Sequence, residues 1–258
     1  MSCKAYEHCL RGRSEYYLYT PDHLVAALTQ FQAAISLDPD YAEAYAYQSY
    51  CRCTLHVFAW PGADTTLDPA ENFARKAVAL DPGSAIAHAR LGWVLAYRDR
   101  LDETVASFET ALTLDPNSAE VHQTYAESMN RAGRPDRALS LIERAFSIDT
   151  FVPPSWEFVR GHAHVLRGDL PAAIDSFTQV LDRVPGFVPA RVQLARALHE
   201  SQRPQDARAE IATLQMRAPR YTTATAQRMF PYPQTTERAR LTDALVAAGL
   251  PTTPKQHS

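Results

Sequence analysis

The sequence predicts an all-α solenoid, because a short block that ends in proline or a similar turn residue recurs about every 34 residues over most of its 258 residues. The block ends are Pro39, Pro82, Pro116, Thr150, Pro185 and Pro219. Subtracting successive end positions gives 43, 34, 34, 35 and 34. A fixed period of this length is typical of stacked supersecondary units, each of which buries its apolar face against its neighbours.

Small and large residues occupy fixed offsets from each block end, which indicates two helices per period. Twelve residues before the end, the side chain is small in every unit: Ala27, Ala70, Thr104, Ala138, Ala173 and Ala207. Eight before it, most are large: Phe31, Ala74, Phe108, Ile142, Phe177 and Ile211. These rows share one helix face at 3.6-residue spacing. A second row of small residues, 24 before the end, predicts the place where the two helices cross: Gly92, Ala126, Gly161 and Ala195.

Prolines support the same phase. They fall at the expected start of the second helix, where the missing N–H costs nothing: Pro21, Pro69, Pro135, Pro171 and Pro204. Thr20 and Asp68 precede two of them, and we expect both to be N-caps.

We therefore expect residues 1–258 to form a single solenoid domain. Its six repeats are predicted at 6–39, 40–82, 83–116, 117–150, 151–185 and 186–219, followed by capping helices over 220–250. The long second interval predicts an insertion near 58–66, read as a packed loop or as an extension of the preceding helix, with Trp60 covering the solenoid edge or contacting a partner.

The repeats resemble the tetratricopeptide repeat (TPR), whose pattern places Leu-Gly on one helix and Ala-x3-Phe and a final Pro on the next. His88-x2-Leu91-Gly92-x2-Leu95, followed by Phe108, Ala111 and Pro116, is a close copy. Gly161, Ala173, Phe177 and Pro185 carry the same marks in a later unit. The resemblance implies a TPR-type α-solenoid: a right-handed superhelix of about six helical hairpins whose first helices line a concave groove.

A narrower resemblance covers nearly the whole chain. The segments 5–13, 37–46, 133–135, 187–191 and 248–251 are similar to the TPR module that follows the catalytic domain in many bacterial class III adenylate cyclases, and to modules that follow winged-helix DNA-binding domains in some bacterial regulators. That resemblance implies an accessory sensing or docking role. We do not expect cyclase activity of residues 1–258, which carry no segment similar to the catalytic domain, and we expect either a free-standing adaptor or a piece of a longer product.

Composition excludes several functions. The net charge of −3, from 26 basic and 29 acidic residues, argues against a nucleic-acid partner, and the absence of a long apolar run argues against membrane insertion. We expect a cytoplasmic protein whose cysteines (Cys3, Cys9, Cys51 and Cys53) remain thiols. His88 and His122, which occupy equivalent places in successive repeats, are expected to stack in neighbouring helices. We find no catalytic or metal-binding motif, and we expect no cofactor.

The partner-binding residues are predicted from the places that face the groove of a TPR superhelix, at positions 23 and 20 before each repeat end. In the second repeat the count runs forward from Pro39. The predicted groove residues are Tyr16, Tyr19, Tyr50, Trp93, Glu127, Asn130, His162, Arg196 and His199. An aromatic half followed by a charged half suits an extended peptide, although the tyrosines could equally pack against one another.

The sequence thus favours a non-enzymatic adaptor that binds a protein or extended peptide, with homo-oligomerisation left open. One alternative is a regulatory subunit or fragment of a cyclase-like or transcriptional signalling protein. The other is an unrecognised enzyme that uses the groove residues His162, Arg196 and His199.

Overall fold

The computed structural model describes residues 2–18, 20–58, 62–64, 66–150 and 152–253, which form fourteen α-helices and no strand. The all-α prediction is confirmed. The helices are α1 (Cys3–Tyr16), α2 (Pro21–Leu37), α3 (Ala42–Val57), α4 (Asp68–Leu80), α5 (Ala85–Ala96), α6 (Leu101–Leu114), α7 (Ala119–Arg131), α8 (Pro135–Ile148), α9 (Pro154–Arg167), α10 (Leu170–Arg183), α11 (Val188–Glu200), α12 (Pro204–Arg217), α13 (Thr223–Met229) and α14 (Thr235–Ala247).

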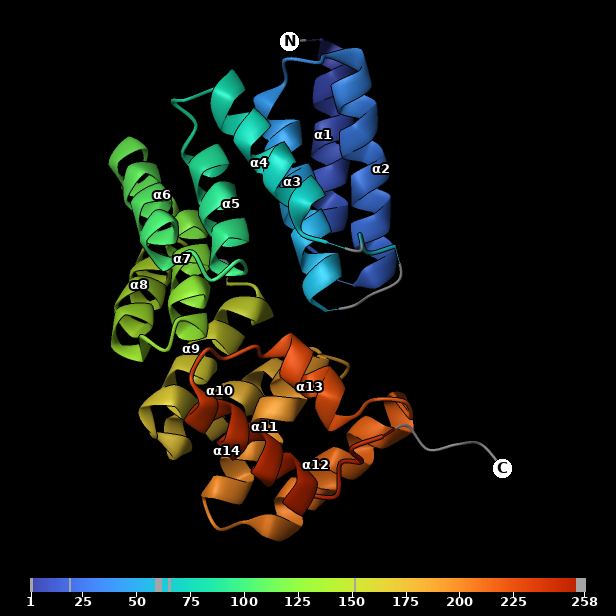
Figure 1. Ribbon diagram of the computed structural model, residues 1–258, viewed down its shortest axis with the longest axis vertical. Helices are drawn as coiled ribbons and strands as arrows, with labels where there is room; N and C mark the ends of the chain where they lie inside the picture. Colours follow the sequence, from blue (N-terminus) through green and yellow to red (C-terminus); the bar gives the residue numbers. More distant parts are fainter. Residues whose placement is uncertain (1, 19, 59–61, 65, 151, 254–258) are drawn as a thin grey trace. The chain divides into compact units, whose positions relative to one another are not determined.

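The helices pair as hairpins within two compact units, Met1–Tyr125 and Ala126–Ser258, each of which is described by itself (Figure 1). In the first unit α1 packs on α2, α3 on α4 and α5 on α6; in the second, α9 packs on α10 and α11 on α12. The first helix of a hairpin also contacts the next first helix, as α3 contacts α5 and α9 contacts α11. The expected continuity of residues 1–258 as one domain stays a prediction.

The Leu-Asp-Pro blocks are the turns that join one hairpin to the next. In three of these turns the aspartate Oδ1 accepts the backbone N–H two residues on, at 3.3 Å from Asp38, 3.0 Å from Asp81 and 3.1 Å from Asp115. Aspartate favours turns because its short carboxylate can make this local bond. The recurring motif therefore encodes a repeated reversal of the chain.

Close contact between the two helices of a hairpin explains the small residues. A Cβ atom added at Gly12 would lie 2.6 Å from a ring carbon of Phe31, and one at Gly92 would lie 2.8 Å from the ring of Phe108. Gly161 has the same relation to Phe177, again at 2.8 Å. Any larger residue would push the phenylalanine out of a core in which it is fully buried.

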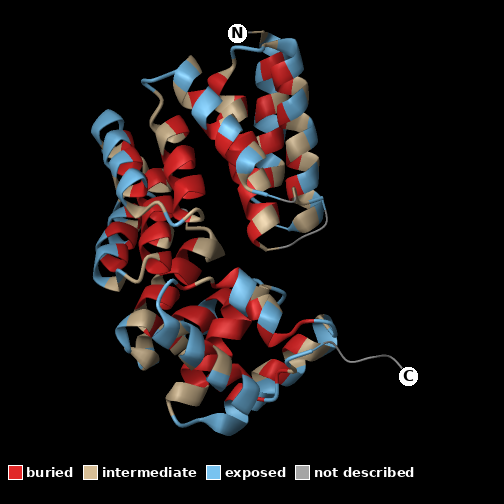
Figure 2. Cartoon of the chain, in the orientation of Figure 1, coloured by how far each residue is buried: buried red, intermediate tan, exposed pale blue. Residues whose placement is uncertain are grey.

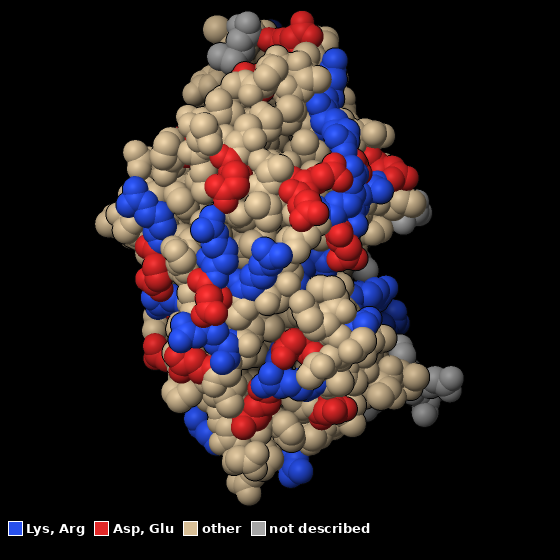
Figure 3. Space-filling view, turned by 60° about the vertical axis from the view of Figure 1, so that its left-hand side comes forward, with Lys and Arg blue, Asp and Glu red and all other residues tan. Residues whose placement is uncertain are grey.

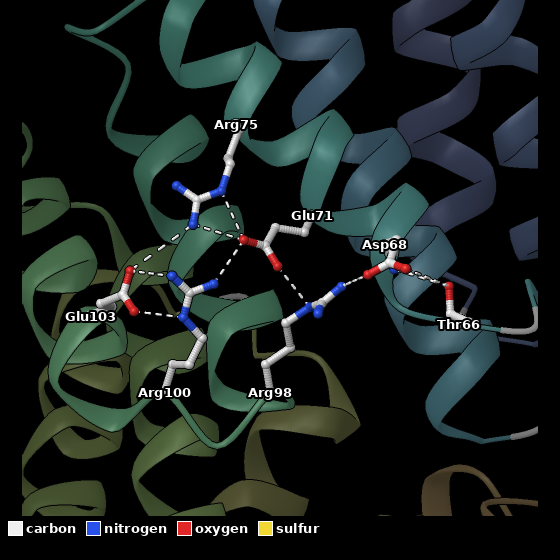
Figure 4. A network of polar contacts seen from close by, with 7 residues as sticks. All are labelled: Thr66, Asp68, Glu71, Arg75, Arg98, Arg100 and Glu103. Carbon is white, nitrogen blue, oxygen red and sulfur yellow. Dashed lines mark hydrogen bonds and ion pairs between the residues drawn. The ribbon is translucent and has the colours of Figure 1, made fainter.

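Helix starts follow the sequence with one exception. The five prolines stand in the first turn of α2, α4, α8, α10 and α12, and the Thr20 hydroxyl accepts the His23 N–H as an N-cap. The expectation for Asp68 is wrong, because α4 begins at Asp68 and the carboxylate instead pairs with Arg98. That pair belongs to a network around Glu71, in which each acidic group has an arginine partner (Figure 4).

His88 and His122 make equivalent hydrogen bonds in successive repeats. The Nε2 atom of each donates to the carbonyl of the proline six residues earlier, at 3.0 Å to Pro82 and 3.0 Å to Pro116. Arg191 makes the corresponding bond to Pro185, at 2.9 Å. The repeated side chain thus ties the first helix to the turn before it.

The described part of the predicted insertion forms a loop against α3. The Asp64 carboxylate accepts from Arg52 at 2.8 Å and 3.0 Å, and its carbonyl accepts from His56 Nδ1 at 2.8 Å. The loop alternative therefore holds for residues 62–64. Trp60 lies outside the described residues.

Candidate partner-binding helices

The glycine–phenylalanine contacts define which residues are equivalent on the first helices. The residue after each contacting glycine is Arg13, Trp93 or His162. Glycine and phenylalanine are 19 residues apart in the first hairpin but 16 apart in the other two. The three extra residues mean that Arg13, and not Tyr16, corresponds to Trp93. Counting back from the repeat end misses this shift because it assumes hairpins of equal length.

Most of the predicted groove residues are buried. Tyr50, Trp93 and Tyr16 are 4%, 1% and 7% exposed, and Asn130, His162 and Arg196 are likewise buried. Glu127 and His199 are half-buried, and Tyr19 lies outside the described residues. The tyrosines follow the alternative in which they pack against one another, since the ring centres of Tyr16 and Tyr50 are 5.1 Å apart and Trp93 stacks on Tyr50 at 5.2 Å. The role of the predicted residues in binding a partner stays a prediction. Figure 2 shows α3 and α5 as mostly buried, whereas α2 and α4 alternate.

In the first unit these side chains form a tyrosine–arginine cluster, which consists of Tyr16, Tyr47, Tyr50, Arg90 and Glu120. The fully buried Arg90 guanidinium lies 4.4 Å from the ring centre of Tyr50, 5.2 Å from that of Tyr47 and 5.7 Å from that of Tyr16. Arg90 is ion-paired with Glu120 and also donates to Thr124 at 3.3 Å. The hydroxyls of Tyr16 and Tyr47 donate to the same Glu120 carboxylate, at 3.4 Å and 3.5 Å.

The surroundings of Arg90 keep its side chain positively charged although it is fully buried. Burial lowers the pKa of Arg90, but Tyr16 and Glu120 raise it, and the resulting pKa lies well above its ordinary value. Burial also raises the pKa of Tyr16 and of Tyr47, so that both phenols stay protonated and able to donate. Arg90 thus remains a cation held by aromatic faces and one carboxylate, an arrangement that is stable only because it is paired.

In the second unit the equivalent helices form a histidine–tyrosine cluster, which consists of His162, Gln193, Arg196, Tyr232 and Glu237. The Tyr232 hydroxyl lies 2.6 Å from His162 Nε2 and accepts from Gln193 Nε2 at 2.9 Å. The fully buried Arg196 pairs with Glu237, and with Glu200 at 2.9 Å. Two further buried atoms, Gln193 Oε1 and Arg196 Nη1, have no hydrogen-bond partner among the described residues.

The protonation of this cluster bears on the enzyme alternative. Burial, assisted by the positive charge of Arg196, lowers the pKa of His162 to about 3. Burial raises the pKa of Tyr232 to about 12. At neutral pH His162 is therefore a neutral ring that is engaged with a neutral phenol. A general base is most effective with a pKa near the working pH, so this pair is poorly matched to acid–base catalysis.

Two buried cysteines of the first unit, Cys9 and Cys51, are held in the thiol form. Burial raises the pKa of Cys9 to about 11 and that of Cys51 to about 12, which keeps both as thiols. Metal binding requires the thiolate. Within the described residues, no group of three or more His, Cys, Asp or Glu side chains is placed to hold a metal ion.

Sequence reasoning missed Arg90, Glu120, Tyr232 and Glu237. Arg90 stands one helical turn before Trp93, on the helix face that was expected to line the groove, so a charge beside the aromatic residues was the available signal. Tyr232 lies in Pro231-Tyr232-Pro233, an aromatic held between two residues that interrupt the helices. Nothing in the repeat pattern assigns Tyr232 or Glu237 to α9 and α11, because both come from outside the repeats.

The family model described as tetratricopeptide repeat matches residues 95–153 and 164–227. TPR repeats are therefore present in both units. No curated protein matches this sequence. The narrower resemblance to modules that follow cyclase domains finds no support in the comparisons.

Solved structures share the same hairpin fold. A thermophilic TPR protein of Thermus thermophilus matches at TM-score 0.58 and 20% identity, over 75% of this chain and 98% of that one. PilW, a type IV pilus biogenesis factor, matches at TM-score 0.56 and 22% identity, over 69% and 82%. The human IFIT1 dimer with m7Gppp-AAAA matches at TM-score 0.73 and 17% identity, over 98% of this chain and 61% of IFIT1. At these identities the likeness shows a TPR-type solenoid fold. In the described residues no helix is long and apolar enough to cross a bilayer.

Proposed function

We propose that this chain is a non-enzymatic protein-interaction module that binds a protein or peptide through its first helices. TPR proteins generally mediate contacts between proteins. The observation that carries the proposal is the exposed rim of the tyrosine–arginine cluster. Tyr17 is 54% exposed, with its ring centre 4.9 Å from that of the buried Tyr16. Beside it lies the half-exposed ion pair of Arg13 and Glu43, at 3.2 Å.

This rim has the composition of a protein-binding hot spot. Tyrosine and arginine supply much of the binding energy at interfaces, where a rigid aromatic centre is surrounded by polar groups. The Tyr17 ring packs against the buried Tyr16 ring, and Arg13 lies 5.5 Å from the ring centre of Tyr47. The rim is therefore supported by buried groups, which lowers the entropy lost on binding.

A protein partner is better supported than RNA, which human IFIT1 holds in its solved structure. The buried arginines of both clusters are already neutralised by glutamates. Acidic and basic side chains are interspersed on the face in Figure 3, and the net charge is −3. RNA binding relies on unneutralised basic surface.

The test compares three full-length chains as affinity baits in lysate of the native host. Tyr17→Ala should lose the partners that the parent chain retains, because it removes the exposed aromatic centre. Met216→Ala, which changes a 75% exposed side chain of the second unit, should retain them. Circular dichroism of all three should be the same, since neither side chain is buried. Equal retention by Tyr17→Ala would refute the assignment of this rim.

A further inference from the structure

The C-terminal segment packs over α9 and α11, the first helices of two hairpins in the second unit. After Tyr221 the chain leaves the repeat pattern, forms α13, runs without helix through residues 230–234 and then forms α14. Residues 230–237 contact the end of α7 and the helices α9 and α11. We call residues 230–237 the terminal strap. The face that a TPR repeat offers to a partner is thus covered here by the same chain.

The terminal strap is held by separate anchors, as a bound peptide is. The Phe230 ring lies edge-on to His162, with ring centres 5.6 Å apart. The Tyr232 hydroxyl contacts His162 and Gln193, and the Glu237 carboxylate pairs with Arg196. Between the anchors the backbone is also bound, since the Pro231 carbonyl accepts from Arg131 Nη1 at 2.7 Å.

The non-helical part of the strap, residues 230–234, suits an extended ligand. Pro231 and Pro233 flank Tyr232 and restrict the backbone on both sides, which reduces the entropy lost on binding. Gln234 Nε2 donates to the Ala132 carbonyl at 3.1 Å. Side-chain anchors combined with bonds to the backbone are typical of the recognition of an extended peptide.

The strap leaves part of its site unsatisfied. Gln193 and Arg196 are fully buried, yet Gln193 Oε1 and Arg196 Nη1 find no partner in the part of the chain that the structure describes. A buried polar atom without a partner costs free energy, and a fully matched occupant would leave none. A segment that offers the same aromatic and carboxylate anchors together with one more donor or acceptor would bind the site better than the strap does.

We propose that α9 and α11 form a peptide-binding site, that residues 230–237 are its intramolecular occupant, and that its partner is a protein segment in which a tyrosine between prolines precedes a carboxylate by five residues. The inference rests on the proposed function only in taking the partner to be a protein. It uses the second unit, whereas the rim of Tyr17 belongs to the first. The partner must displace the strap, so occupancy by the strap regulates access to the site.

The experiment adds a peptide copy of the strap, which competes with the internal strap for the site. The probe is a fluorescein-labelled peptide of residues 228–240, and its anisotropy is measured with full-length chains. Tyr232→Phe removes only the hydroxyl that contacts His162 and Gln193. It should raise the affinity for the probe about 5- to 10-fold over the parent chain, because loss of this hydroxyl and its two hydrogen bonds weakens the internal competitor. Tyr232→Ala should raise it further. The matched control is Tyr221→Phe, which removes a buried hydroxyl that contacts Met229 Sδ at 3.5 Å, and it should leave the affinity unchanged.

The probe itself tests the anchors. A probe that carries Phe in place of Tyr232, or Gln in place of Glu237, should bind Tyr232→Ala about 5- to 10-fold more weakly than the unaltered probe. Adding Gln193→Ala to the protein should reduce the difference between the Tyr and Phe probes. If Tyr232→Ala fails to fold, Tyr232→Phe decides the question.

Equal probe binding by the parent chain, Tyr232→Phe and Tyr221→Phe would overturn the proposal, as would a scrambled probe that binds as well as the unaltered one. The probe needs no cellular partner. Failure here would therefore leave the result for Tyr17 standing, and failure of Tyr17 would leave this one standing.

Discussion

Replacing Glu120 by Gln should destabilise the first unit strongly, because it leaves the charge of Arg90 buried without a counter-ion. The side chain of Arg90 is 0% exposed and its Nε atom already lacks a partner within the described ranges, while the side chain of Glu120 is 21% exposed. Removing one member of a buried ion pair costs roughly 3–5 kcal/mol, and the partial exposure of Glu120 reduces this to about 2–4 kcal/mol. Arg90→Met should lower the free energy of unfolding by less than removal of one member of a buried ion pair usually does, because the Glu120 carboxylate that remains can reach solvent.

The assay is urea unfolding followed by circular dichroism and by tryptophan fluorescence. Trp93 stacks on Tyr50 at 5.2 Å between ring centres and reports on the cluster, whereas Trp156 belongs to the second unit. The double variant Arg90→Met/Glu120→Gln should be more stable than the sum of the single effects implies. The matched control is Glu103→Gln, whose carboxylate pairs with Arg100 at the surface and is 51% exposed; its effect should be close to nil. If Glu120→Gln unfolds at the same urea concentration as the parent chain, Arg90 is not a buried cation.

Three further predictions concern packing and protonation. Ala138→Leu and Ala173→Leu each place a large side chain at a fully buried position and should cost on the order of 1–3 kcal/mol in urea unfolding; no loss in either would refute the repeat phase. Gly92→Ala would set a Cβ atom 2.8 Å from the ring of Phe108 and should cost about 1–3 kcal/mol, of which Phe108→Leu should recover a part; additive losses would disprove the contact. Burial holds the pKa of His162 at about 3, below its ordinary 6.5, so the unfolded chain takes up the proton first as the pH falls. The stability associated with His162 is thus complete above pH 6.5 and is lost progressively toward pH 3, and His162→Gln should flatten the fall measured between pH 6.5 and 4, by up to about 1.4 kcal/mol per pH unit.

Much of the fold was predictable because it depends on local rules. The period of the Leu-Asp-Pro blocks, the small residues at Gly92 and Gly161 and the prolines at helix starts each act within one hairpin. The capping role of Asp68 was wrong because a distant partner, Arg98, competes for its carboxylate. The register of the first helix was missed because the hairpin length changes there, which a count from the repeat end cannot detect.

The candidate sites were predicted less well, for a physical reason. Trp93 and Arg196 were expected at an open groove, yet both are buried by side chains that come from other helices. The row to which they belong was correctly placed on the first helices. Whether a residue on that row is open depends on how closely the next first helix approaches and on whether another segment covers it.

The sequence by itself determined the repeat, the helices and the face of each helix that meets its hairpin partner, because these follow from residue size and spacing over fewer than about 40 positions. Only the tertiary structure decided the chemistry of the two clusters. Glu120 reaches Arg90 from 30 residues away, and Tyr232 reaches His162 from 70 residues away. A buried charge or phenol is stable only beside a partner, and contacts over such separations leave no period in the sequence.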